Sequence, residues 1–301
     1  MKCYYNISAL TLLVFVLISD IAIAQNKKDT LYWGLYFPEV NRNYVEKIYK
    51  SWNAWMDLFK SKSTNKNVKG GKFIAAQYNS FEKLMTDIMN NKIDVLTLFT
   101  TDYFNYGLDK YFYPVLTTSK SLENKFLRYV IICNTQRNVY LNTVDNIEFN
   151  LPESDNSNLM SIWIKSKIGN KKFSRWKNVK ITKLSKTESQ LIYSVFFNSI
   201  NYAVVSDASL FVAMELNPQI KSKIKIIDVS PDLINFLVVI RKEYDKENAN
   251  IIIDVCSNLH KSVEGKQILN LAQAVRFVPI VSHDLQETER LIKQAKQISS
   301  K

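Results

Sequence analysis

With 301 residues, of which 47% are hydrophobic, the chain is long enough for two domains with substantial apolar cores. Its formal net charge is +12, but the lysines are scattered singly and in pairs, which excludes the dense basic block of a nucleic-acid-binding arm. Only six glycines occur, which argues against loops that wrap a nucleotide.

The first 24 residues have the pattern of a secretory signal peptide. Lys2 precedes an apolar run at residues 9–18, and Ala22–Ala24 supplies the small residues that a signal peptidase requires. The run is too short for a membrane anchor, although an uncleaved signal anchor is the alternative. Cys3 lies before the run, so it cannot be the lipid-bearing cysteine of a lipoprotein. We therefore expect a mature chain that begins at Gln25 and is free in the periplasm.

Strand and helix periods alternate in the next part of the chain. The segments 31–36, 72–76 and 93–99 are predicted to be strands. Apolar residues at helical spacing occupy residues 45–59 and 81–89 between them. This order predicts a β-α-β-α-β lobe with a parallel sheet.

A weaker version of the pattern recurs later and predicts a second lobe. A strand at 128–134 enters this lobe, and a helix that Ser189 opens is followed by a strand at 202–205. A strand at 224–229 ends the lobe, and a strand at 233–240 returns to the first. Two crossings between lobes form a hinge.

The predicted division is a signal peptide at 1–24, a discontinuous first lobe at 25–118 and 232–301, and a second lobe at 119–231. The tail from residue 243 onward is predicted to be mainly helical. Cys133 and Cys256 fall in different lobes and in apolar stretches, so we expect buried thiols rather than a disulfide.

Motifs of the common enzyme classes are absent from the sequence. There is no nucleophile elbow, no phosphate-binding glycine loop and no paired-cysteine metal spacing. His260 and His283 lie in the C-terminal helical region, far in sequence from the predicted cleft. We expect a protein that is not an enzyme, without catalytic residues, a metal site or a cofactor.

Several short segments occur in an order and at spacings that are specific to one fold. They are Gly34–Glu39, Tyr78 with Ser80–Leu84, Asn91–Leu96, Tyr129–Cys133, Val204–Asp207, and Gly265–Leu269 leading to Phe277–Pro279. With these segments the chain resembles the phosphate, phosphite and phosphonate-type periplasmic solute-binding components of ABC transporters. The resemblance covers nearly the whole mature chain. It implies an α/β, two-lobed type 2 periplasmic-binding fold, in which each lobe is a mostly parallel sheet flanked by helices.

The resemblance also implies an anion site, which in this family is a Ser-Thr-Ser-Gly run at the start of a second-lobe helix. Backbone N–H groups and the helix dipole favour an anion there. Here Asp155 and Asn156 stand at the first Ser-Thr pair, Ser157 at the second serine and Asn158 at the glycine. These residues are good helix caps, but a carboxylate beside a phosphate dianion is repulsive. Ligand binding and helix capping alone both stay open.

Further candidates lie where strands end, because ligands of open α/β sheets bind beyond the carboxyl ends of the strands. A tyrosine there can pack on a ligand and donate its hydroxyl, although an ordinary half-buried tyrosine is the alternative. In the second lobe the family's histidine aligns with Ser189, and an aspartate of the family aligns with Tyr202. The predicted ligand site comprises Tyr36, Tyr78, Thr100, Thr101, Asp102, Tyr103, Asp155, Asn156, Ser157 and Ser189.

The predicted function is capture of a small anionic or zwitterionic solute, phosphate-like or phosphonate-like, by hinge closure, with delivery to a membrane ABC permease. One alternative is a sensory binding protein that docks on a membrane kinase or cyclase, and another is a scaffold whose cleft has decayed. We expect a monomer that binds no nucleic acid. The positive charge is interpreted as lysines on solvated helix faces, with attraction of an anionic solute or membrane as the alternative.

Overall fold

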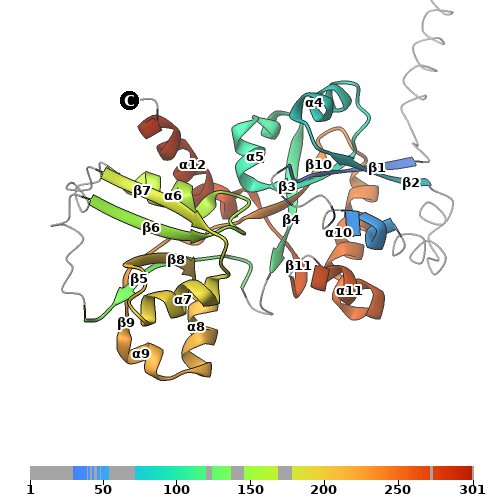
Figure 1. Ribbon diagram of the computed structural model, residues 1–301. Helices are drawn as coiled ribbons and strands as arrows, with labels where there is room; N and C mark the ends of the chain where they lie inside the picture. Colours follow the sequence, from blue (N-terminus) through green and yellow to red (C-terminus); the bar gives the residue numbers. More distant parts are fainter. Residues whose placement is uncertain are drawn as a thin grey trace, which may run out of the picture.

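The structure is a computed structural model that describes residues 30–38, 40, 43, 46–47, 49–53, 72–119, 124–136, 146–168, 178–271 and 274–299. The predicted signal peptide at 1–24 and the predicted loop at 60–71 lie outside these residues, as does most of the helix predicted at 45–59. Two separate sheets, each flanked by helices, form two lobes joined by crossing segments (Figure 1). The predicted α/β, two-lobed class is therefore confirmed.

The first lobe is built on a six-stranded sheet with the order β11-β4-β10-β3-β1-β2. Its strands are β1 (Thr30–Tyr36), β2 (Lys72–Tyr78), β3 (Val95–Phe99), β4 (Phe112–Ser119), β10 (Phe236–Arg241) and β11 (Arg276–Pro279). β1 lies between β2 and β3 and pairs with both in parallel. The parallel pairing agrees with the order predicted for these three strands, and it places their carboxyl ends at one edge.

The second lobe is built on a five-stranded sheet with the order β7-β6-β8-β5-β9. Its strands are β5 (Tyr129–Asn134), β6 (Asn146–Pro152), β7 (Asn178–Leu184), β8 (Tyr202–Ser206) and β9 (Ile224–Val229). β6 pairs in parallel with β7 and β8, whereas β5 is antiparallel to β8 and β9.

Strand direction and the strand inventory differ from the sequence prediction. Both sheets are mixed rather than mostly parallel, because β10 and β5, which follow the crossings, run antiparallel to both of their neighbours. The sequence pattern also misses β4, β6, β7 and β11, so the tail is not helical throughout. β4 contains Pro114, which lacks a backbone N–H and lies where the pairing with β10 shifts register.

The helices cover the faces of the two sheets. They are α4 (Phe81–Met89), α5 (Thr100–Asn105), α6 (Leu159–Lys167), α7 (Glu188–Phe196), α8 (Asp207–Leu216), α9 (Gln219–Lys223), α10 (Lys246–Ser257), α11 (Val263–Leu271) and α12 (Gln286–Ser299). Ser80 caps α4, and Thr187 forms a capping box with Gln190, so α7 begins one residue before the predicted Ser189. Within the described ranges, none of the helices combines the length and apolar character needed to cross a bilayer.

Each sheet buries apolar side chains on both of its faces. Trp33 and Tyr36 of β1, for example, belong to the clusters on opposite faces of the first sheet. In the second lobe Trp163 and Phe149 are fully buried. Cys256 lies in the first lobe's core and Cys133 in the second's, and no disulfide joins them.

The two crossings pair with each other between the sheets. The backbone N–H of Leu127 donates to the carbonyl of Leu233 at 2.8 Å, and the reverse bond is 2.9 Å long. The N–H of Ile234 donates to Oγ1 of Thr288, a fully buried residue of α12, at 2.9 Å. α12, which the predicted division assigns to the first lobe, packs against α6 of the second lobe as well as α5 of the first. The exact lobe boundaries stay a prediction.

Candidate functional site

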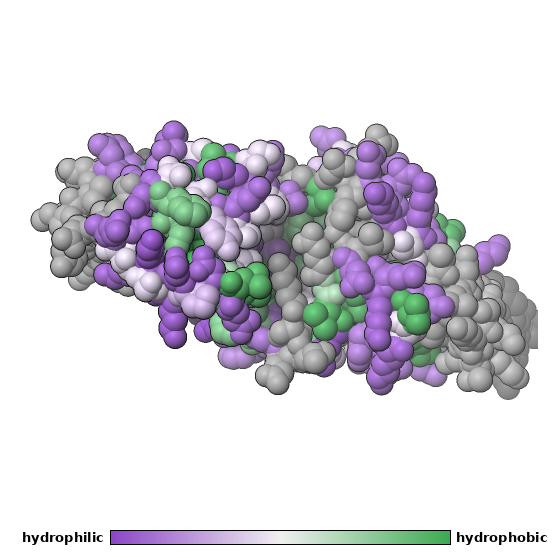
Figure 2. All heavy atoms as spheres, turned by 60° about the horizontal axis from the view of Figure 1, so that its bottom comes forward, coloured by the Kyte–Doolittle hydropathy of each residue, from purple (hydrophilic) through white to green (hydrophobic). Residues whose placement is uncertain are grey.

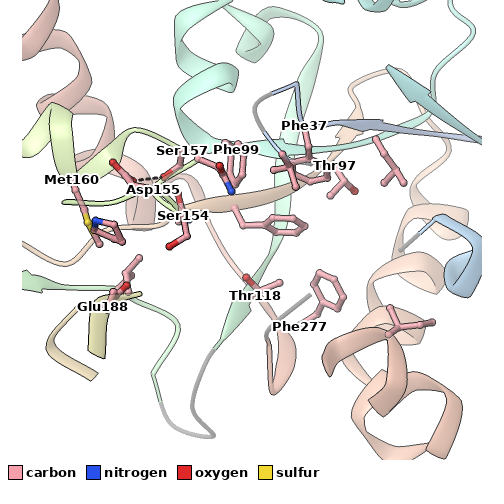
Figure 3. A pocket seen from close by; sticks show the side chains of 18 of the residues that line it. Phe37, Thr97, Phe99, Thr118, Ser154, Asp155, Ser157, Met160, Glu188 and Phe277 are labelled. Carbon is pink, nitrogen blue, oxygen red and sulfur yellow. Dashed lines mark hydrogen bonds between the residues drawn. The ribbon is translucent and has the colours of Figure 1, made fainter. Parts of the chain in front are cut away.

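A cavity of about 280 Å³ lies between the two lobes, and both of them contribute to its walls (Figure 3). The first lobe supplies six aromatic side chains, Trp33, Phe37, Trp52, Phe99, Phe236 and Phe277. The second lobe supplies a mainly polar wall, formed by Tyr129, Ser154, Asp155, Asn156, Ser157 and Glu188. The cavity is therefore apolar on one side and polar on the other.

The aromatic wall is a continuous series of ring contacts. The rings of Trp33 and Trp52 meet edge to face with centroids 4.7 Å apart, and Trp52 contacts Phe277 at 6.3 Å. Phe277 lies 6.1 Å from Phe236, which stacks on Phe37 at 5.7 Å. Such edge-to-face and stacked contacts favour the observed ring orientations.

Strand parity explains which side chains reach the cavity. Successive side chains of a strand point to opposite faces, so residues two apart share a face. Trp33 and Leu35 of β1, and Phe37 directly after it, are spaced two apart and line the cavity, as do Thr97 and Phe99 of β3. The indole N–H of Trp33 donates to Oγ1 of Thr97 at 2.7 Å, which ties the two strands together beneath the cavity.

The polar wall is built around the first turn of α6. Asn158, at the N-cap, has φ 58°, a left-handed conformation that glycine adopts freely and asparagine tolerates better than most residues. The ammonium of Lys183 donates to Oδ1 of Asn158 at 2.8 Å and to the carbonyl oxygen of Asp155 at 2.7 Å. The turn is thereby held in place from β7.

Asp155 is a buried carboxylate at this helix start, with only 5% of its surface exposed. Burial raises its pKa above the ordinary carboxyl value, while Lys183, the backbone N–H groups of Met160 and Ser161, and the Ser157 hydroxyl act in the opposite direction. Oδ2 of Asp155 is buried and has no hydrogen-bond partner. The carboxylate thus occupies the position at the helix N-terminus where an anion would otherwise bind.

Tyr129 and Glu188 complete the polar wall. Burial raises the pKa of the Tyr129 hydroxyl, and the nearby charges of Asp155 and Glu188 raise it further. Oε2 of Glu188 accepts the backbone N–H of Ser206 at 2.8 Å and also its hydroxyl, which fixes the carboxylate at the start of α8. Of the described residues that line the cavity, Asp155 and Glu188 are charged, and both are acidic.

Three of the ten predicted site residues line this cavity, namely Asp155, Asn156 and Ser157. Ser189 does not line it, whereas its neighbour Glu188 does. Tyr36 and Tyr78 are register partners on the opposite face of the first sheet, where the Tyr78 hydroxyl donates to Asp87 at 2.9 Å.

The four predicted residues that follow β3 lie in or at the start of α5, away from the cavity lining. Thr100, Thr101 and Tyr103 are buried, and the Tyr103 hydroxyl donates to the carbonyl of Phe112 at 3.0 Å. Asp102 lies in the first turn of the same helix. The role of these residues in ligand binding stays a prediction.

The aromatic wall is the part of the site that sequence reasoning missed. A signal was present, because Trp33, Leu35 and Phe37 alternate along one predicted strand and Thr97 and Phe99 along another. Alternation alone does not show which face of the sheet lines the cavity. Within the described part of the chain, no group of three or more His, Cys, Asp or Glu side chains could hold a metal ion.

Comparison with known proteins identifies one matching family. Residues 40–285 match the family described as the periplasmic substrate-binding protein of the phosphonate ABC transporter. No curated protein matches the chain significantly.

Solved structures share the fold at low sequence identity. PhnD1 from Prochlorococcus marinus, in complex with methylphosphonate, has 15% identity and a TM-score of 0.56, with 90% of this chain and 100% of that chain covered. A Xanthomonas citri protein bound to ATP has 10% identity and a TM-score of 0.60, with coverages of 90% and 98%. A binding protein of an ABC phosphonate transporter from Pseudomonas aeruginosa has 12% identity and a TM-score of 0.52, with coverages of 90% and 87%.

Proposed function

The chain belongs to the family of periplasmic substrate-binding proteins of phosphonate ABC transporters, and we propose that it captures its solute in the cavity between the two lobes. Members of this family are transport proteins rather than enzymes. They act in the periplasm, where they bind a small-molecule ligand and work with a membrane permease. The observation that carries the proposal is the cavity itself, whose walls come from both lobes on either side of the paired crossings.

The proposed binding residues are those that present polar atoms to the cavity from the second lobe. Asp155, Asn156 and Ser157 belong to the predicted site, and Tyr129 and Glu188 join them. Hinge closure would bring this wall towards the aromatic wall of the first lobe and exclude water from the solute. The solute would be small, because the cavity measures about 280 Å³.

Export and delivery follow from the same proposal. The chain would be exported through the N-terminal signal peptide, released from the membrane without a lipid anchor, and act as a monomer. Figure 2 shows one face of the molecule, on which hydrophilic side chains cover much of both lobes. The closed form would then dock on the permease.

A thermal-shift screen tests the proposal. A solute at a hundred times its dissociation constant stabilises the folded state by about 2.7 kcal/mol, which raises the melting temperature by several degrees. The screen contains phosphate, phosphite, methylphosphonate, 2-aminoethylphosphonate, sulfate, amino acids, small carboxylates and small amines. At least one solute should raise the melting temperature, and the rise should be smaller in Trp52→Ala. If no compound of any charge gives a shift, the proposed function is wrong.

A further inference from the structure

The cavity has an acidic wall in a protein whose overall charge is strongly positive. The formal net charge is +12, yet among the residues that the structure describes the charged side chains lining the cavity are Asp155 and Glu188. Figure 3 shows both on the second-lobe side, facing Phe99, Thr118 and Phe277 across the cavity. A bound anion would have to approach two carboxylates, with no lysine or arginine among the lining residues that the structure describes, which is unfavourable in a partly desolvated site.

Two oxygen atoms of the lining are buried without a hydrogen-bond partner, and both only accept hydrogen bonds. They are Oδ2 of Asp155 and Oδ1 of Asn235, the residue that precedes Phe236. A buried acceptor that lacks a donor costs free energy, so such groups point to a ligand that supplies one. A protonated amine carries N–H donors and a positive charge, which match these atoms.

The helix N-terminus at the cavity offers no free place for an anion. The backbone N–H groups of Met160 and Ser161 at the start of α6 already stabilise the charged form of Asp155. A phosphonate group would have to compete with a side chain that is 95% buried and covalently attached to the site. The position that would bind the anionic end of a ligand is filled by the protein itself.

The opposite wall is suited to the remainder of such a ligand. Phe37, Phe236 and Phe277 form a series of rings with centroid separations of 5.7 and 6.1 Å. Apolar groups gain free energy on these rings, and a cation close to a ring face is attracted by its quadrupole. An amphipathic cation is therefore complementary to both walls at once.

We infer that the ligand of this cavity is a protonated organic amine with an apolar or aromatic body, whose N–H groups bind Asp155 and whose body packs on the aromatic wall of the first lobe. The inference rests on the proposed function, specifies its substrate class, and departs from the phosphate-like or phosphonate-like anion that the sequence and the family predict. It assigns Asp155 the role of specificity determinant rather than that of a helix cap alone.

Three probes with the same phenyl body isolate the effect of charge. They are 2-phenylethylamine, which is protonated at neutral pH, the neutral 2-phenylethanol and the anionic 3-phenylpropionate, each measured by isothermal titration at pH 7.5. The amine should bind about tenfold or more tightly than the alcohol, the usual effect of a hydrogen bond to a charged group. The carboxylate should bind more weakly than either.

Asp155→Asn should weaken binding of the amine by about tenfold or more and leave the affinity of the alcohol unchanged. Glu188→Gln provides a second variant and should weaken the amine selectively, to a smaller extent. Glu215→Gln removes one exposed carboxylate of α8 outside the cavity lining and is the matched control, with no change expected. A thermal melt of each variant confirms that it is folded.

The possible outcomes separate the inference from the proposed function. If the carboxylate or the alcohol binds as tightly as the amine, or if the amine binds Asp155→Asn as well as the native protein, the inference is wrong. If anions from the thermal-shift screen bind and the amine does not, the inference fails while the proposed function stands. If neither the probes nor the screen gives binding, both fail.

Discussion

At the scale of single residues, Asp155 combines features that are costly for folding and useful for binding. The carboxylate is buried, and one of its oxygens has no hydrogen-bond partner. Burial raises its pKa against the effects of Lys183, the first amides of α6 and Ser157. Buried charges that are retained without full compensation are concentrated at functional sites, where binding rather than stability maintains them.

The stability of the ligand-free protein should therefore increase in Asp155→Asn. The pKa of Asp155 is higher in the folded state than in the unfolded state. The protonated carboxyl therefore stabilises the fold fully at pH values below the unfolded-state pKa, and this stabilisation is lost as the pH rises through the folded-state pKa. At pH 7 Asp155→Asn should melt about 2 °C higher than the native protein, and the difference should shrink towards pH 4. Differential scanning calorimetry at both pH values measures this. An equal or lower melting temperature for the variant at pH 7 would contradict the cost assigned to Asp155.

Asn158 sets the direction in which the chain enters α6. Its left-handed backbone, with φ 58°, is accessible to glycine without strain and costs a branched residue about 1–2 kcal/mol. Asn158→Val should therefore lose about 1–2 kcal/mol more stability than Asn158→Gly, although both variants lose the bond from Lys183. Urea unfolding of the two variants measures the difference. Equal losses would show that the hydrogen bond, and not the backbone conformation, determines the choice of residue.

At the scale of elements, Arg241 of β10 joins the strand to the end of α4. Its guanidinium donates to the carbonyl of Ile93 at 2.7 Å, to the carbonyl of Ile88 at 3.0 Å and to Oδ1 of Asn91 at 3.0 Å. The group also lies 5.2 Å from the ring centroid of Phe112. One side chain thus supplies hydrogen-bond donors to backbone carbonyl groups at and just after the end of α4. These bonds also hold β10 in its place between β4 and β3.

Arg241→Met should destabilise the protein by about 2–4 kcal/mol, because it leaves the buried carbonyl groups of Ile88 and Ile93 without these donors. Arg290→Met is the control, since Arg290 pairs with Glu287 on the exposed side of α12 and should contribute less than about 1 kcal/mol. Guanidinium unfolding of both variants gives the comparison. Similar losses in the two would refute the structural role assigned to Arg241.

Hydrophobic periodicity predicts the elements of the first lobe well and its site poorly. Apolar runs identify β1 and β3, which are buried on both faces, and a clear helical period identifies α4, which buries one face. β6 and β7 also carry alternating apolar residues, which the prediction overlooked, whereas β11, with four residues, is too short to show a period. Alternation also cannot tell which face of a sheet with two buried faces meets a ligand, so Tyr36 was an equally plausible choice to Trp33. The family resemblance placed Asp155, Asn156 and Ser157 at the predicted site, and their capping side chains indicated only a helix start.

At the scale of the whole molecule, three connections set the possible motion. The two crossings pair through Leu127 and Leu233, and α12 contacts both lobes while Thr288 accepts the N–H of Ile234. Rotation about the paired crossings would change the separation of the cavity walls without disturbing either sheet. Because α12 packs on α6 and α5, it would have to slide against one of them during closure, which limits the motion to a defined path.

Solute binding should therefore make the molecule more compact. The cavity has walls from both lobes, so a solute that contacts both walls would bind the closed arrangement more tightly than the open one. This difference in affinity shifts the population towards the closed arrangement. The radius of gyration from small-angle X-ray scattering should decrease when 2-phenylethylamine is added to saturation. Saturation can be followed by tryptophan fluorescence, because Trp33 and Trp52 lie in the wall. Asp155→Asn at the same amine concentration should stay closer to the ligand-free value. An unchanged radius with a saturated fluorescence signal would show that the solute binds without closure of the lobes.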